Sequence, residues 1–230
     1  MPEEAAALFL HGGGGGGWEW RRWSAVWRAH GITVHAPDLQ PQPAGLGSTR
    51  WEDYAGQVRA HLACLPAPRT VVGASLGGLL AAEAAASADA LILINPLPPA
   101  SLHRQLPARE WPEVVPWRRL ARLPGTRAAM PDADAASALA AFRHWRDESG
   151  AVLCHAAAGV EVAPPACPTL VIASLDDTDV PAALSRSLAQ AWQADWLEVD
   201  GGHVDPLLGR QAAALASQAV DWLNRRRRQI

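Results

Sequence analysis

The chain of 230 residues contains no lysine, so all 20 of its lysine and arginine residues are arginine. A lysine is needed for a Schiff base, for the anchor of pyridoxal phosphate and for a phosphate-binding P-loop. The sequence therefore excludes these three kinds of site. Three cysteines are too few for a disulfide framework.

Other features are also scarce. The formal net charge is -3, so the chain has no global basic field that would attract nucleic acid. No apolar run approaches the roughly 18 residues of a membrane span, and the first residues lack the basic start of a signal peptide. The arginines at 225–228 end an amphipathic helical stretch and suit its dipole. We expect a cytoplasmic protein with no nucleic-acid or membrane partner, and the sequence does not indicate its oligomeric state.

The most informative motif is Gly73-Ala74-Ser75-Leu76-Gly77. A β-branched run at 70–72 precedes it and an alanine-rich, helix-forming stretch at 78–88 follows it. Between a strand and a helix, G-x-S-x-G places its serine in a sharp, exposed turn, which the two glycines permit because they lack Cβ atoms. An ordinary glycine-rich turn is the alternative, but this context favours a nucleophilic Ser75.

A serine nucleophile needs a base, usually histidine, and a carboxylate that orients it. A buried strand over 168–174 precedes a loop with three aspartates, and a shorter strand over 196–200 precedes Gly201, Gly202 and His203. The carboxyl ends of strands are where α/β sheets place their chemistry. Each residue alone also fits a helix cap or a solvated turn, but the order Ser, Asp, His favours a catalytic triad.

At this point the chain resembles the α/β-hydrolase family over nearly its whole length. His11-Gly12-Gly13 matches the family's oxyanion-loop motif, and residues 34–38 match its second strand and the exit from it. Residues 73–77 match the nucleophile elbow, residues 174–181 the acid loop, and Gly202-His203 the histidine loop. Ser174 stands where the family's acid loop usually has glycine.

The resemblance implies a role for each matching residue. Ser75 would be the nucleophile, Asp177 the acid and His203 the base, with Asp176 and Asp179 as rival acids. Some relatives carry the acid after the preceding strand, but Asn95-Pro96 occupies that place and supplies no carboxylate. The backbone N–H groups of Leu76 and of Gly12 and Gly13 would form the oxyanion hole.

The glycine run Gly12–Gly17 has a second interpretation as a phosphate cradle. Six consecutive glycines satisfy dinucleotide spacing only trivially, and no lysine follows them. We interpret the run as a flexible loop that forms the oxyanion hole, and we expect neither a cofactor nor a metal.

Strands and helices alternate along the chain with short connections, which is typical of an α/β fold with a mostly parallel sheet of about six strands flanked by helices. The expected strands are Ala7–His11, Thr33–Pro37, Thr70–Gly73, Leu91–Asn95, Thr169–Ser174 and Trp196–Val199. The expected helices are Trp20–His30, Trp51–Leu65, Leu76–Ala88, Ala182–Ala191 and Gln211–Arg225.

One segment breaks the alternation. Residues 98–167 contain many prolines, no convincing strand and a helical stretch at 134–146, which Asp132 or Asp134 can cap. A long insertion without strands is usually a lid or a binding element, and in the family it caps the serine. We predict a hydrolase core of residues 1–97 and 168–230 and a cap of residues 98–167. Leu139, Phe142 and Trp145 fall on one face of the helix, which would pack on the core or roof the pocket.

Tryptophan dominates the aromatic residues, with 11 against one tyrosine and two phenylalanines. Trp20, Trp23 and Trp27 recur at helical spacing and predict a buried stripe. We expect an apolar substrate pocket that is lined by Trp18, which follows the glycine run, and by the tryptophans of the insertion. The tryptophans of the insertion are Trp111, Trp117 and Trp145.

These features predict a serine hydrolase that cleaves a small-molecule carboxylic ester with an apolar moiety through an acyl-enzyme on Ser75. A C–C bond hydrolase, a thioesterase and a lyase-type or biosynthetic relative would use the same triad. A non-catalytic small-molecule receptor is the alternative of another class, and the presence of all three triad residues in the required order argues against it.

Overall fold

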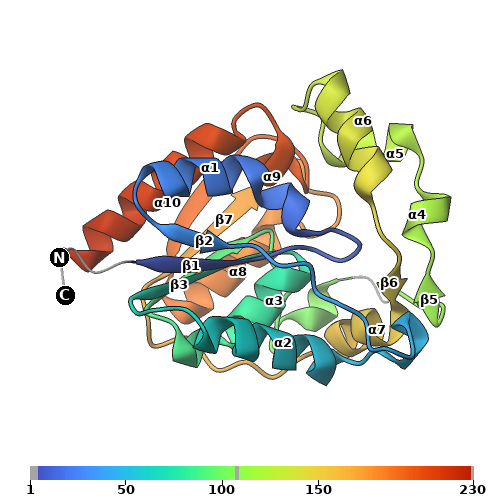
Figure 1. The fold of residues 1–230 in the computed structure, drawn as a ribbon, viewed down its shortest axis with the longest axis horizontal. Helices are drawn as coiled ribbons and strands as arrows, with labels where there is room; N and C mark the ends of the chain where they lie inside the picture. The colour runs from blue at the N-terminus through green and yellow to red at the C-terminus, as the bar shows by residue number, and fades with distance from the viewer. Residues whose placement is uncertain (1–4, 107–108, 229–230) are drawn as a thin grey trace.

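The computed structural model describes residues 5–106 and 109–228. Its centre is a sheet of six parallel strands (Figure 1). Their order across the sheet is β2 (Thr33–His35), β1 (Ala6–Leu10), β3 (Arg69–Ala74), β4 (Ala90–Ile94), β7 (Thr169–Ser174) and β8 (Asp195–Val199). The six-stranded parallel sheet expected from the sequence is confirmed.

Helices cover both faces of the sheet. One face packs against α1 (Arg21–Ala29) and α10 (Ala212–Arg227), and the other against α2 (Trp51–Ala63), α3 (Leu76–Glu83) and α8 (Ala182–Trp192). Shorter helical turns are η1 (Gly17–Trp20), η2 (Leu46–Ser48), η3 (Ala85–Ser87), η4 (His103–Gln105) and α9 (Asp205–Leu208).

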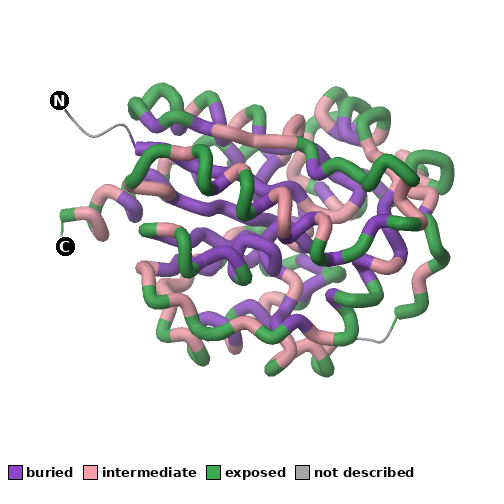
Figure 2. The backbone as a smooth tube through the Cα atoms, turned by 60° about the horizontal axis from the view of Figure 1, so that its bottom comes forward, coloured by how far each residue is buried: buried purple, intermediate pink, exposed green. Residues whose placement is uncertain are grey.

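The inner strands are apolar and buried on both faces, as a parallel sheet between helices requires. Figure 2 shows them as buried tracts through the middle of the molecule. The predicted tryptophan stripe is also confirmed, because Trp20, Trp23 and Trp27 are fully buried. Their ring centroids lie 5.0, 6.3 and 5.1 Å from that of Phe9 in β1, so the stripe fastens α1 and η1 to the sheet.

Residues 98–167, here called the insertion, connect β4 to β7. They form β5 (Val114–Val115), α4 (Trp117–Leu120), α5 (Leu123–Ala129), α6 (Ala135–His144), β6 (Glu148–Ser149) and α7 (Gly150–Ala158). Figure 1 shows α4, α5 and α6 at one side of the core. Helix α7 contacts α2 and α3 of the core. The sequence predicted no strand here, whereas β5 and β6 pair antiparallel, because two-residue strands are too short to show a periodicity.

Helix α6 confirms the predicted helical stretch, and its cap is Asp134, whose carboxylate accepts the backbone N–H of Ser137 at 2.7 Å. The predicted face of Leu139, Phe142 and Trp145 is only partly confirmed, because Leu139 is exposed whereas Trp145 packs against the cluster around Met130. The buried face instead presents Ala138 and Ala141, whose small side chains allow α6 to approach its neighbours closely.

Candidate active site

Ser75 stands at the end of β3, immediately before α3. Its backbone has φ 52° and ψ −118°, a conformation that residues other than glycine rarely adopt. The turn is possible because Gly77 has no side chain: a Cβ there would lie 2.4 Å from the carbonyl oxygens of Leu10 and His11. The serine is thus held in the strained strand-to-helix turn that the motif predicts.

Asp177 and His203 come together from the loops that follow β7 and β8. His203 Nδ1 lies 2.7 Å from Asp177 Oδ2. The other carboxylate oxygen of Asp177 accepts the backbone N–H groups of Asp179 and Val180 at 2.8 and 2.9 Å. Asp177 is buried whereas Asp176 is exposed, and Asp179 faces Arg109 at 3.6 Å. Of the three loop aspartates, Asp177 therefore orients the imidazole.

The contact between Asp177 and His203 changes the pKa of the imidazole. Burial alone would lower the pKa of His203, but the hydrogen bond and the negative charge of Asp177 outweigh it, so the pKa is raised. The hydrogen bond to Asp177 engages Nδ1 and leaves Nε2 as the ring nitrogen available for proton exchange.

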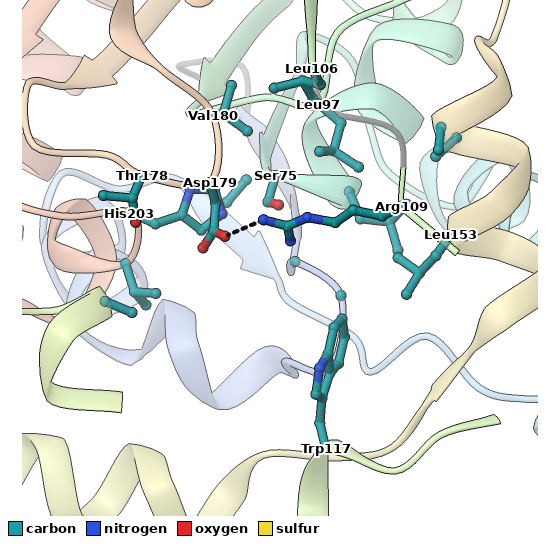
Figure 3. Close-up of a pocket in the computed structure, with 18 of the residues that line it drawn as sticks. Ser75, Leu97, Leu106, Arg109, Trp117, Leu153, Thr178, Asp179, Val180 and His203 are labelled. Atoms are coloured by element: carbon teal, nitrogen blue, oxygen red, sulfur yellow. Dashed lines mark ion pairs between the residues drawn. The ribbon is translucent and has the colours of Figure 1, made fainter. Parts of the chain in front are cut away.

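Ser75 and His203 line the same cavity, whose volume is about 890 Å³. Figure 3 shows both residues at this cavity, with Trp117 and Leu153 on the side of the insertion. The apolar part of the wall includes Leu97, Leu106 and Val180. A Cβ on Gly12 would lie 3.8 Å from Ser75 Oγ, so the glycine loop (Gly12–Gly17) borders the serine directly. The site thus combines an apolar chamber with a serine, an imidazole and adjacent backbone N–H groups.

The structure places most of the predicted site residues at this cavity. Its lining includes Gly12, Gly13, Leu76, Trp111, Trp117 and Trp145.

Among the predicted substrate-binding residues, Trp18 does not line this cavity, so its predicted place in the cavity wall is wrong. Its ring lies 5.4 Å from that of Trp145 and 5.3 Å from that of His144, and it packs with Met130 in a small separate cluster. The turn of η1 directs Trp18 towards α6, and the next residue, Glu19, lines the cavity instead.

Glu19 is a site residue that sequence reasoning missed. Its side chain is 4% exposed, and its carboxylate accepts the backbone N–H of Gly16 at 3.3 Å. Burial raises the pKa of Glu19 to about 7, although hydrogen bonding to the glycine loop and the nearby His203 oppose the rise. The available signal was a lone acid between two tryptophans directly after the glycine loop.

Comparisons with known proteins agree with this architecture. The sequence profile described as "Alpha/beta hydrolase family" matches residues 7–218. The chain belongs to the α/β-hydrolase family. No protein of curated function matches this hydrolase significantly by sequence.

Three solved structures illustrate the likeness of this α/β hydrolase to known folds. A pyrethroid hydrolase from Sphingobium faniae has 21% identity and a TM-score of 0.70, covering 96% of this chain and 97% of its own. A methylesterase from Arabidopsis has 17% identity and a TM-score of 0.75, covering 95% and 99%. Methylketone synthase I from tomato, solved with 2-tridecanone, has 15% identity and a TM-score of 0.77, covering 97% and 99%. At such identities the likeness establishes the fold.

Asn95 is a second residue whose part the sequence did not reveal. It has a left-handed backbone, with φ 44°. Its side-chain Nδ2 donates to the carbonyl oxygen of His203 at 2.8 Å and to Ser174 Oγ at 2.9 Å, and its Oδ1 accepts the N–H of Ser174. In this hydrolase Asn95 therefore ties the ends of β4 and β7 to the histidine loop.

Asp177, Asp179 and His203 each bring one potential metal-ligand atom within 4.8 Å of the others. Nδ1 of His203 pairs with Asp177, and the carboxylate of Asp179 pairs with Arg109. This arrangement suits an acid–base pair better than a metal site.

No helix in residues 5–106 and 109–228 is long and apolar enough to cross a membrane.

Proposed function

We propose that this α/β hydrolase cleaves a small-molecule carboxylic ester with an apolar moiety, through an acyl-enzyme on Ser75. The observation that carries the proposal is the 2.7 Å contact between Asp177 and His203, because His203 lines the same cavity as the strained Ser75. Such an assembly is suited to activating a hydroxyl group that is otherwise a poor nucleophile at neutral pH.

In the proposed reaction, Ser75 Oγ attacks the ester carbonyl while His203 Nε2 takes its proton. Asp177 keeps the imidazole in the required tautomer and stabilises the imidazolium. The N–H groups of Leu76 and of Gly12 and Gly13 bind the oxyanion. His203 returns the proton to the leaving alcohol, and a water molecule, activated by the same imidazole, then hydrolyses the acyl-enzyme.

The insertion acts in this proposal as a cap over the serine. Trp111, Trp117 and Trp145 supply apolar wall area from the insertion, and Leu97 and Val180 supply it from the core. A cavity with this lining favours an ester with an apolar acyl or alcohol part, because apolar burial contributes about 25 cal/mol per Å².

The test is a panel of p-nitrophenyl esters of increasing acyl length, together with labelling by a fluorophosphonate probe. Ser75→Ala should abolish labelling and lower kcat by about 10⁴-fold or more while the circular dichroism spectrum stays unchanged. Ser187→Ala, at a half-buried serine of α8 that does not line the cavity, is the matched control. Ester turnover by Ser75→Ala close to that of the control would refute the proposal.

A further inference from the structure

The glycine loop is held in place, contrary to the flexibility that its sequence predicts. Gly14 accepts the backbone N–H of Arg146 at 2.7 Å and donates its own N–H to Glu148 Oε2 at 3.0 Å. The carbonyl oxygen of Gly15 accepts a hydrogen bond from Arg146 Nε at 2.6 Å. The stretch 146–148, which leads from α6 to β6 of the insertion, thus contacts the middle of the loop through three hydrogen bonds.

Arg146 and Glu148 are themselves fixed by the core. Glu148 is buried, and its Oε1 accepts hydrogen bonds from the Tyr54 hydroxyl and from the backbone N–H of Ser149, both at 2.8 Å. Arg146 Nη1 lies 3.3 Å from Asp38 Oδ2. Because Asp38 Oδ1 accepts the N–H of Gly17 at 2.7 Å, this network also reaches the end of the loop.

The packing between loop and insertion is close enough to require glycine. Gly14 has φ +68°, and a Cβ there would lie 3.0 Å from the carbonyl oxygen of Arg146 and 2.4 Å from the ring of Trp117. A chain of glycines has many accessible conformations, so external contacts must select one. The hydrogen bonds from residues 146–148 provide that selection.

We propose that Arg146 and Glu148 are positioning residues that hold the glycine loop in the geometry of the oxyanion hole, an inference that rests on the proposed function. An oxyanion hole is effective only when its donors are already aimed at the place where charge develops. Gly12 and Gly13, the proposed donors, immediately precede the two glycines that residues 146–148 hold. The insertion therefore does two things at this site: it supplies apolar wall and it orders the hole.

Arg146→Ala and Glu148→Ala test this inference, with Arg143→Ala on the exposed side of α6 as the matched control. A donor that helps only the transition state lowers kcat and leaves KM nearly unchanged. We expect kcat to fall roughly 10- to 100-fold in both variants, less than for complete loss of a donor, with KM within about threefold of the control. The affinity for an aryl trifluoromethyl ketone, whose serine adduct carries an oxyanion, should fall by about the same factor as kcat.

A second readout separates positioning from general damage. Neither variant touches His203 or Asp177, so the acid limb of the kcat/KM profile should keep its midpoint. Tyr54→Phe removes one hydrogen bond to Glu148 and leaves the Gly14 contact in place. If the alanine variants fail to fold, this milder variant should still show a fall in kcat of roughly two- to fivefold at constant KM.

Three results would overturn the inference: kcat within twofold of the Arg143→Ala control in the variants that fold, a rise in KM at constant kcat, or unchanged affinity for the trifluoromethyl ketone. Failure of the proposed function would look different, because the wild-type protein would then not be labelled by the fluorophosphonate at Ser75. Labelling of Ser75 together with unaffected Arg146 and Glu148 variants would refute only the positioning role.

Discussion

Replacing Glu19 by glutamine should change how the stability of the fold depends on pH. Burial raises the pKa of Glu19 from 4.5 to about 7, so the folded state binds the proton more tightly than the unfolded chain does. The stability that the protonated carboxyl contributes is fully present below pH 4.5 and is lost as the pH rises through 7. A difference of about 2.5 between the two pKa values corresponds to about 3 kcal/mol.

Glutamine matches the shape of the protonated carboxyl and can still accept the N–H of Gly16, but it does not ionise. The free energy of unfolding of the wild type, minus that of Glu19→Gln, should therefore fall by about 3 kcal/mol between pH 4.5 and 7.5. Urea denaturation followed by tryptophan fluorescence at several pH values measures this difference. Glu52→Gln, at an exposed position of α2, controls for the loss of a negative charge as such.

The wild-type profile alone would hide this effect, because His11 has the opposite one. Burial lowers the pKa of His11 to about 4, so its contribution to stability is present above pH 6.5 and is lost as the pH falls through 4. The difference between wild type and Glu19→Gln removes the His11 contribution. Parallel stability curves for these two proteins would show that the Glu19 carboxylate ionises freely in the fold, and the reasoning from its burial would be wrong.

Four further substitutions test the site and the fold. Asp177→Asn should lower kcat by about 10³- to 10⁴-fold, because the imidazole would then take the wrong tautomer. Asp179→Asn should change kcat little, since the ion pair of Asp179 is exposed. A large loss of kcat in Asp179→Asn alone would contradict the assignment of the acid. Trp117→Ala should shift the preference between long and short acyl esters by roughly 1–3 kcal/mol with little effect on acetate, and an equal loss for all esters would argue against a wall contact. Gly77→Ala should destabilise the fold by more than about 2 kcal/mol, because the new Cβ would overlap two backbone oxygens that cannot move aside. Thermal denaturation measures this loss, and an unchanged midpoint would show that the backbone around Gly77 has room for a side chain.

Local sequence was sufficient wherever a short segment carries its own geometry. The strand-turn-helix around Ser75 follows from a β-branched run, two glycines and an alanine-rich helix, and all three elements lie within about twenty residues. The four inner strands of the sheet follow from largely apolar runs, because a strand that is buried on both faces needs apolar residues along most of its length. These features depend on neighbours in sequence, so one sequence reveals them.

Only the tertiary structure decided what depends on distant neighbours. The family resemblance favoured Asp177 as the acid but left Asp176 and Asp179 as rivals, and the outcome depends on how the loop after β7 meets the loop after β8. Whether Trp18 or Glu19 reaches the cavity wall depends on how the short helical turn η1 is oriented, since successive residues of a 3₁₀ turn point about 120° apart.

The order of the glycine loop is the clearest case. Read alone, consecutive glycines predict freedom, because nothing in their own chemistry prefers one conformation. Their hydrogen-bond partners at 146–148 are more than 120 residues away in sequence, and no local pattern connects the two segments. The fold brings buried acceptors and donors to the loop, and the requirement that buried polar groups be paired then selects its conformation.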